Sequence, residues 1–186
     1  DIASAKALLD SAGIKPDANG VRIRAILDLI PYGEDWRRAG EYLKQVLGDI
    51  GIKLELRYED VPTWLKRIYH NYDFVMNVNY FYQLPDPVLG VHRHYGTDQI
   101  RKGTHFVNSS RYSNSELDEL LASGATEANA QKRTQIYKKI QEILARDMPV
   151  VNLFELQFLT VYNTKLKGAY NSALGAYASF SEAYLD

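Results

Sequence analysis

The chain has 186 residues, of which 46% are hydrophobic and 24% charged, so it is long enough for one domain or one large lobe with a sizeable core. The formal net charge is −1 and no run of basic residues occurs, so neither a nucleic acid nor an anionic membrane surface is expected as a partner. Cysteine is absent, which excludes disulfides, thiolate metal sites and a cysteine nucleophile. No apolar run approaches the roughly 18 residues of a membrane span, so no membrane insertion is expected.

The first predicted elements form a strand–helix–strand unit. Residues 4–12 carry apolar side chains at helical spacing, and residues 21–29 alternate between apolar and polar, which is typical of a strand. The next helix is expected to bury a stripe made of Trp36, Ala39, Leu43, Val46, Leu47 and Ile50. Residues 52–58 alternate again, so the two strands should be parallel and joined by a right-handed crossover.

The same pattern then occurs a second time. Residues 60–71 predict a short helix with a proline in its first turn, and residues 73–79 predict a third strand of the same sheet. Two successive crossovers favour an α/β fold with helices flanking a mixed, mostly parallel sheet. Residues 83–112 look like a loop, and a loop of that length is usually functional or packs against another part of the protein.

The C-terminal part of the chain begins with two predicted helices. Ser113 and Glu116 match a capping box for the first, and residues 129–147 predict the second, ended by Met148 and Pro149. Residues 150–154 and 158–162 are apolar runs of the β type. The tail after them is small and aromatic and has no clear period.

The motifs of common enzyme sites are missing from the sequence. It contains no P-loop, no G-x-G-x-x-G after a strand, no G-x-S-x-G elbow and no H-E-x-x-H. Acidic neighbours such as Asp118 and Glu119 would point to different faces of their helix and suit a solvated surface. These observations favour a protein that binds rather than catalyses, without a cofactor.

His92 and His94 are the one candidate metal pair in the sequence. On an extended segment these two side chains would share a face, and two imidazoles could begin a transition-metal site. No third ligand is evident nearby, and Arg93 lies between them. The favoured alternative is that both histidines pack or hydrogen-bond within the loop, and no metal is expected.

The third predicted strand runs into an aromatic tip formed by Tyr80, Phe81 and Tyr82 and followed by Gln83. These rings could simply pack under the long loop. Alternatively, the end of the strand carries them into the crevice where open α/β sheets bind ligands. Because side chains alternate along an extended segment, we expect Phe81 to point into the core and the two tyrosines to point toward the ligand.

The order of several segments resembles one protein family across essentially the whole chain. The segments are "AKALLDSAG" before "PDANGVR", "YLKQVLGDIGIKLEL", "YDFVMNVNY" before a "DP" step, "RYSNSELDELL", "KRTQIYKKIQEILARDMPVVNL" and "YASFSEAYLD". Together they are similar to the C-terminal part of family 5 extracellular solute-binding proteins, which serve ABC importers of peptides, nickel and related solutes.

The resemblance implies a fold, a location and partners. It implies one lobe of a type II periplasmic-binding-protein-like fold over residues 1–165, with the tail 166–186 returning to an N-terminal lobe outside this sequence. It further implies a monomeric receptor, periplasmic or anchored at the cell surface. The receptor would capture a peptide or other small-molecule solute between two lobes and deliver it to the membrane subunits of an ABC importer.

The resemblance also implies which residues contact the solute. In dipeptide-binding and oligopeptide-binding members, an aspartate before the "DP" step pairs with the α-ammonium group of the ligand, and Gln83 occupies that position here. A neutral amide supplies no opposite charge. Asp86 could supply it instead or could only shape the turn before Pro87.

The expected site therefore consists of Tyr80, Phe81, Tyr82 and Gln83, together with Asn108 and Arg111 from the loop that follows. Arg111 could pair with a carboxylate of the solute or could simply be solvated. Two other classes stay open. One is the effector-sensing domain of a transcriptional regulator built on the same module, and the other is an α/β enzyme whose site carries no familiar motif.

Overall fold

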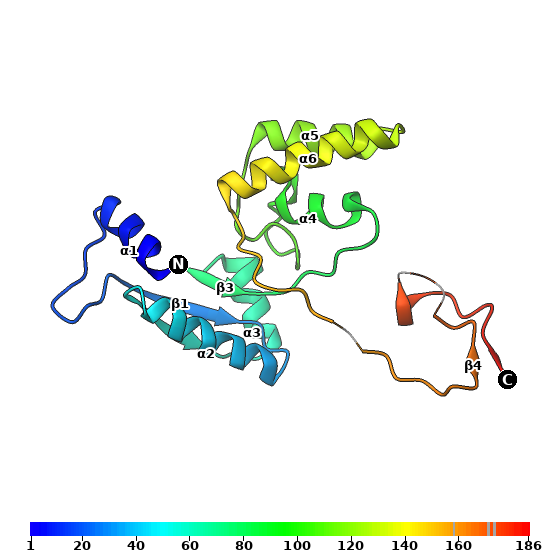
Figure 1. Ribbon diagram of the computed structural model, residues 1–186, viewed down its shortest axis with the longest axis horizontal. Coiled ribbons are helices and arrows are strands. Elements are labelled where there is room, and N and C mark those ends of the chain that lie inside the picture. Colours follow the sequence, from blue (N-terminus) through cyan, green and yellow to red (C-terminus); the bar gives the residue numbers. More distant parts are fainter. Residues whose placement is uncertain (158, 171, 173) are drawn as a thin grey trace. The chain divides into compact units, whose positions relative to one another are not determined.

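The computed structural model describes residues 1–157, 159–170, 172 and 174–186. The chain forms two compact units, one of residues 1–81 and 101–109 and the other of residues 82–100 and 110–186 (Figure 1). Each unit is built around a hydrophobic core of its own.

The first unit is a small parallel α/β sheet. Its elements are α1 (Ile2–Ser11), β1 (Ile23–Leu29), α2 (Glu34–Gly48), β2 (Ile52–Arg57), α3 (Val61–Leu65), which continues as the π-helix η1 (Lys66–Asn71), and β3 (Met76–Val78). The strand order is β2-β1-β3, and both neighbouring pairs are parallel. The predicted α/β class and the placement of the three strands in one sheet are therefore confirmed.

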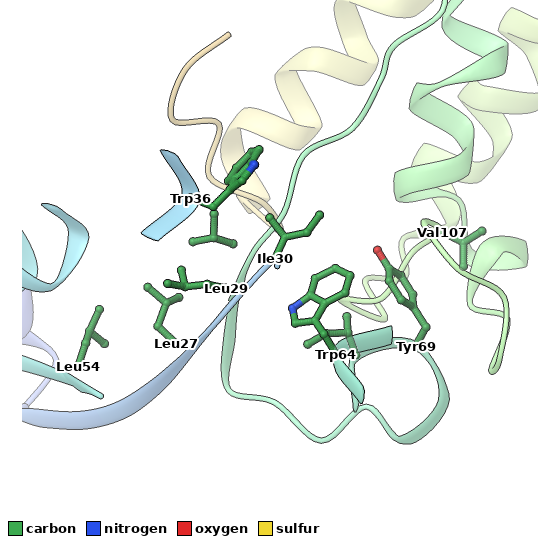
Figure 2. Close-up of a cluster of buried hydrophobic side chains, with 10 residues drawn as sticks. Leu27, Leu29, Ile30, Trp36, Leu54, Trp64, Tyr69 and Val107 are labelled. Carbon is green, nitrogen blue, oxygen red and sulfur yellow. The ribbon is translucent and has the colours of Figure 1, made fainter. Parts of the chain in front are cut away.

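The core of the first unit gathers side chains from the sheet and from the helices beside it (Figure 2). Its buried members are Leu27, Leu29, Ile30, Trp36, Leu54, Trp64, Ile68, Tyr69, Val78 and Val107. Helix α2 contributes Trp36, and the rest of its predicted stripe is at least half-buried. The helical spacing of the sequence thus identified the correct face of α2.

The third strand is shorter than predicted, because only Met76–Val78 pairs with β1. The preceding residues are held at the end of the π-helix instead. The backbone N–H of Asp73 donates to the carbonyl of Arg67, and the Asp73 carboxylate pairs with the Arg67 guanidinium. The chain joins the sheet only after it has left these contacts.

The second unit is mainly helical. Its elements are the 3₁₀ turn η2 (Pro87–Leu89), α4 (Val91–Tyr95), the 3₁₀ turn η3 (Thr97–Gln99), α5 (Ser115–Thr126), α6 (Ala130–Asp147), β4 (Leu166–Lys167), the 3₁₀ turn η4 (Gly175–Tyr177) and β5 (Tyr184–Leu185). Helices α5 and α6 pack against each other, and Leu117, Leu121, Ile140 and Ile143 form the buried centre. The segment predicted as a loop therefore contains a short helix and two turns.

The predicted capping box at the start of α5 is wrong by one residue. Asn114, not Ser113, is the N-cap, and its side-chain oxygen accepts a hydrogen bond from the N–H of Leu117 at 3.1 Å. The Ser113 hydroxyl bonds to the Thr97 hydroxyl instead. Both residue types cap helices well, so only the backbone path could decide between them.

The predicted β-type runs after α6 are also wrong for the part that the structure describes. Residues 150–157 and 159–162 are neither helix nor strand, and Phe158 lies outside the described residues. Large apolar side chains here face solvent, with Leu159 90% and Val161 95% exposed.

Further on, β4 and β5 pair antiparallel. No helix in the described part of the chain combines the length and apolar character needed to cross a bilayer.

Candidate functional site

An aromatic cluster lies where β1 and β3 end in the first unit. It consists of Tyr32, Trp36 and Tyr80. The Tyr80 ring stacks on Trp36 with centroids 5.5 Å apart, and Tyr32 meets Tyr80 edge-on at 5.9 Å. Tyr32 is 42% exposed, so the cluster has a buried side and a solvent side. The carboxyl end of a parallel sheet is where open α/β folds bind ligands.

The structure overturns the predicted orientation of Tyr80. Residues 79–84 are neither strand nor helix, so the alternation of side chains does not apply to them. Tyr80 is half-buried and packs against the core of the first unit. The backbone N–H of Tyr80 donates a hydrogen bond to the side-chain oxygen of Asn79. Phe81 is half-buried as well. Tyr32 was missed by the sequence reasoning, although an aromatic directly after a buried strand could have drawn attention to it.

Tyr82 and Gln83 open the second unit. Tyr82 is 40% exposed and contacts the Tyr177 ring edge-on at 6.1 Å. The Gln83 side chain is folded back over Gly90, where a Cβ atom would overlap its amide. A side chain at position 90 would displace the flexible end of the Gln83 side chain, whereas the backbone of Gln83 is 3.5 Å away.

Asp86 shapes the turn before Pro87, which was one of the two roles considered for it from the sequence. Its Oδ1 accepts hydrogen bonds from the N–H of Val88 at 2.9 Å and from the Arg133 guanidinium at 2.7 Å. The hydrogen bond from Arg133 is the main reason that the pKa of Asp86 is below its usual value, and the Val88 N–H adds to the effect. A carboxylate whose charge is already balanced in this way is a weak partner for an ammonium group of a solute.

Asp86 and Arg133 also line an open groove of about 740 Å³, with Leu89, Glu127 and Tyr137 on its walls. The Arg133 guanidinium donates to the carbonyl of Gly124 and lies over the Tyr137 ring at 5.2 Å. These contacts hold the α5–α6 connection to the 86–89 turn.

The two remaining predicted site residues differ in burial. Asn108 is 1% exposed at the end of the first unit, so it contributes to the packing of the 101–109 segment. Arg111, in the second unit, is exposed and has a backbone φ of 57°, in the left-handed region. Their contact with a solute stays a prediction.

His92 and His94 do not form a metal pair. Both lie on helix α4, where residues i and i+2 point in different directions, so the assumption of an extended segment was wrong. His92 Nε2 lies 3.0 Å from Asp98 Oδ1, whereas His94 is buried. In the part of the chain that the structure describes, no group of three or more His, Cys, Asp or Glu side chains could hold an ion.

His94 should make the protein acid-sensitive. Burial lowers the pKa of His94 to about 3, whereas a solvated histidine titrates near 6.5. Between these values the unfolded chain binds a proton that the folded chain does not, so stability falls as pH falls through this window. We expect urea unfolding to show a slope of about 1 kcal/mol per pH unit between pH 6 and pH 5, reduced in the variant His94→Gln. An equal slope in wild type and variant would assign the effect to other groups.

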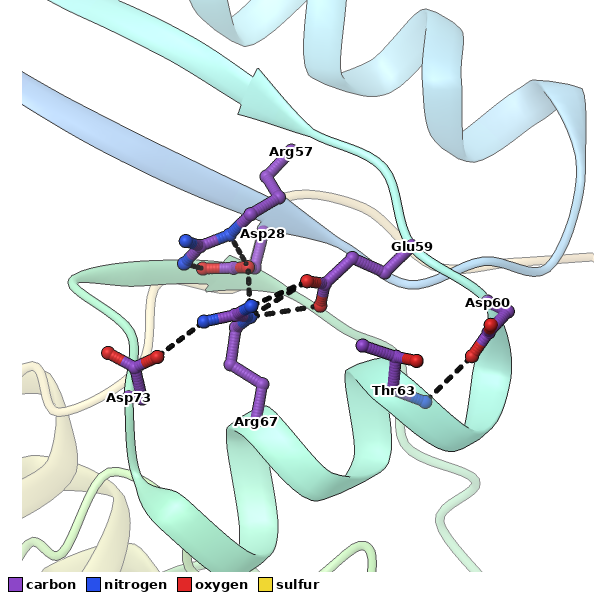
Figure 3. A network of polar contacts seen from close by, with 7 residues as sticks. All are labelled: Asp28, Arg57, Glu59, Asp60, Thr63, Arg67 and Asp73. Atoms are coloured by element: carbon purple, nitrogen blue, oxygen red, sulfur yellow. Dashed lines mark hydrogen bonds and ion pairs between the residues drawn. The ribbon is translucent and has the colours of Figure 1, made fainter.

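A network of charged side chains at the carboxyl ends of β1 and β2 was missed by the sequence reasoning (Figure 3). The Asp28 carboxylate is 1% exposed and accepts two hydrogen bonds from Arg57, at 2.6 and 2.9 Å. Arg67 on the π-helix donates to both oxygens of Glu59, lies 3.8 Å from Asp28, and pairs with Asp73.

Each carboxylate of the network has an arginine partner. Hydrogen bonds from Arg67 hold the pKa of Glu59 below its usual value, and the bond to Asp28 raises the pKa of Arg57. These ion pairs join the π-helix to the ends of the two strands. The one sequence signal was an aspartate between two leucines near the end of β1.

Comparison with known proteins identifies similar chains. Residues 1–102 match the model of the bacterial extracellular solute-binding proteins, family 5 (middle part). The chain is 24% identical over 151 residues to the peptide transport periplasmic protein SapA of Haemophilus influenzae and 22% identical over 178 residues to di/tripeptide-binding protein 3 of Pseudomonas aeruginosa. These alignments cover 79% and 96% of this chain but 26% and 32% of the two relatives.

Solved structures show the same likeness. AppA of Clostridium difficile, described as a candidate peptide-binding protein, superimposes over 100% of this chain with a TM-score of 0.79 at 26% identity. The match covers 37% of AppA. The chain therefore spans between 26% and 37% of the length of these three proteins.

Proposed function

Because the chain belongs to family 5 of the bacterial extracellular solute-binding proteins, we propose that it is part of the solute-binding component of an ABC importer. The observation that carries this proposal is the family match, which extends over more than half of the chain. Family 5 proteins bind solutes for transport and are not enzymes, in agreement with the missing catalytic motifs. Nothing in the family match or in the described structure favours the regulator alternative.

The proposed cargo is a peptide or a related small solute. The names of SapA and of di/tripeptide-binding protein 3 support this class. The solute would be enclosed between this lobe and the remainder of the protein by a hinge motion, and the closed complex would dock on the membrane subunits of the importer. The receptor would act as a monomer in the periplasm or at the cell surface.

Within this lobe, we propose that the solute contacts Tyr80, Phe81, Tyr82 and Gln83, with Asn108 and Arg111 as further contacts. The solvent side of the aromatic cluster supports the placement, since Tyr32 is 42% exposed beside Tyr80. Gln83 would hydrogen-bond the solute without charge. Asp86 is paired with Arg133, so an ion pair with a free amino terminus is not the proposed mode of recognition.

The proposed domain organisation keeps a lobe over residues 1–165 and a tail over residues 166–186 that packs against a part of the protein outside this sequence. The exposed apolar side chains of this tail support it, because exposed apolar surface often marks an interface. Tyr177 and Leu185 are the most exposed of them.

The test uses the full-length protein purified from its host. Native mass spectrometry should detect a retained solute in the peptide mass range, and calorimetry should then measure its affinity. If the solute is a peptide, acetylation of its amino terminus should weaken binding less than about tenfold, because no free carboxylate faces it in the proposed mode. A loss of more than about a hundredfold would contradict this mode of recognition, and a protein that binds no peptide would contradict the proposed cargo.

A further inference from the structure

Two exposed histidines from distant parts of the sequence meet at the surface of the first unit. His70 lies near the end of the π-helix and His105 in the 101–109 segment, and their Nε2 atoms are 3.1 Å apart. Both side chains are exposed, so ions in solution can reach the two nitrogens. The sequence reasoning considered only the neighbouring pair His92 and His94.

One backbone hydrogen bond and one ring contact hold this histidine pair in place. The N–H of Gly103 donates to the carbonyl of Tyr69 at 2.8 Å, which ties the segment of His105 to the residue before His70. Gly103 has a φ of 87°, in the left-handed region, so glycine suits this turn beside the His70 ring. The His105 ring also packs on buried Tyr69, with centroids 5.9 Å apart.

The helix that carries His70 is itself unusual. A single turn of π-helix changes which side chains share a face, and such turns occur frequently at functional sites. Tyr72, with a φ of 52°, then ends this turn in the left-handed conformation. The irregular turn, rather than a regular α-helix, determines the direction in which His70 points.

The distance between the two nitrogens suits a shared metal ion. With metal–nitrogen bonds of about 2.0–2.1 Å, two ligating nitrogens lie about 2.9 Å apart at a right angle and about 3.4 Å apart at the tetrahedral angle. The observed 3.1 Å falls inside this range. The ring centroids are 5.3 Å apart, so the rings meet nearly end to end, and each exposed ring would turn by roughly 40° to aim its lone pair at one shared ion.

From this geometry we propose that His70 and His105 together bind one divalent transition-metal ion of the class that imidazole favours, with Zn²⁺ as the probe. In the metal-free protein one Nε2–H donates to the other Nε2. On binding, the donor ring moves its proton to Nδ1, so that both Nε2 atoms offer a lone pair. This site goes beyond the proposed solute-binding function and replaces the expectation from sequence that the chain holds no metal.

The remaining coordination positions would be filled from solution. Among the described residues no third His, Cys, Asp or Glu joins the pair, so water or a dissolved ligand completes the shell. An open site of this kind resembles metal sites that exchange ligands rather than closed structural sites.

The test is calorimetric titration of the untagged full-length protein with ZnCl₂. We expect that His70→Asn and His105→Asn each weaken the tightest Zn²⁺ site at least tenfold, and that the double variant is less than about threefold weaker than either single variant, because the two ligands act as a unit. His92→Asn is the matched control, since His92 is a partly exposed histidine on a short helix that already contacts Asp98, and it should leave the affinity unchanged.

Thermal unfolding of each variant shows whether it is folded, and His105→Gln replaces any variant that is not. The proposal is overturned if the wild type has no site at which both variants act, or if His92→Asn weakens binding as much as the other two. In either case His70 and His105 form a hydrogen bond and no metal site. None of these outcomes depends on solute binding, so failure here leaves the proposed transport function untouched.

Discussion

Replacing Arg57 with alanine should lower the free energy of unfolding by about 3–5 kcal/mol, because it leaves a buried carboxylate without its main partner. Asp28 is 1% exposed and accepts both of its close hydrogen bonds from Arg57. Arg67 lies 3.8 Å from Asp28 but is already committed to Glu59 and Asp73, so it cannot fully replace the lost guanidinium. Urea unfolding of the full-length protein measures the effect.

Arg24, on β1, provides the matched control. Arg24 pairs with Asp17 at 3.0 Å, but both side chains are well exposed, so Arg24→Ala should cost less than about 1 kcal/mol. The double variant Asp28→Leu with Arg57→Met should recover most of the stability lost in Arg57→Ala, since it removes both charges together. Equal effects of Arg57→Ala and Arg24→Ala would show that burial of Asp28 is not what makes its pair important.

Replacing Tyr80 with alanine should reduce both stability and solute affinity. Tyr80 stacks on Trp36 and packs on the core, so its truncation should leave a cavity and lower the free energy of unfolding by about 2–3 kcal/mol. The same ring supports Tyr32 on the solvent side of the aromatic cluster, so we expect solute affinity to fall at least about tenfold, or about 1.4 kcal/mol. Denaturant unfolding and calorimetry with the solute retained by the full-length protein measure the two effects.

Two variants separate the contributions of Tyr80. Tyr80→Phe keeps the ring and should change stability by less than about 1 kcal/mol. Tyr82→Ala, at a position 40% exposed, should weaken solute binding with a stability change below about 0.5 kcal/mol. If Tyr80→Ala is as stable as the wild type, the Tyr80 ring does not pack on the core. That result would support the orientation predicted from side-chain alternation, with the ring directed at solvent.

The sequence by itself determined the parallel sheet of the first unit and the family. The strand–helix–strand patterns depend on local periodicity, and short crossovers allow only one sensible pairing of β1 with β2. The face of α2 and the extent of α6 followed from helical spacing in the same way. The order of the family segments was visible because each is a local stretch of sequence.

The features that were missed or wrong depend on contacts between residues far apart in the chain. Asp28 meets Arg57 from 29 positions away, and His70 meets His105 from 35 positions away, and no periodicity within a strand or helix encodes such meetings. Tyr80 turned toward Trp36 because β3 had already ended and the strand alternation no longer constrained its side chain. Local pattern thus determined which elements form, and tertiary packing alone decided which side chains meet, because burial and ion pairing are free energies of the folded chain rather than of any single segment.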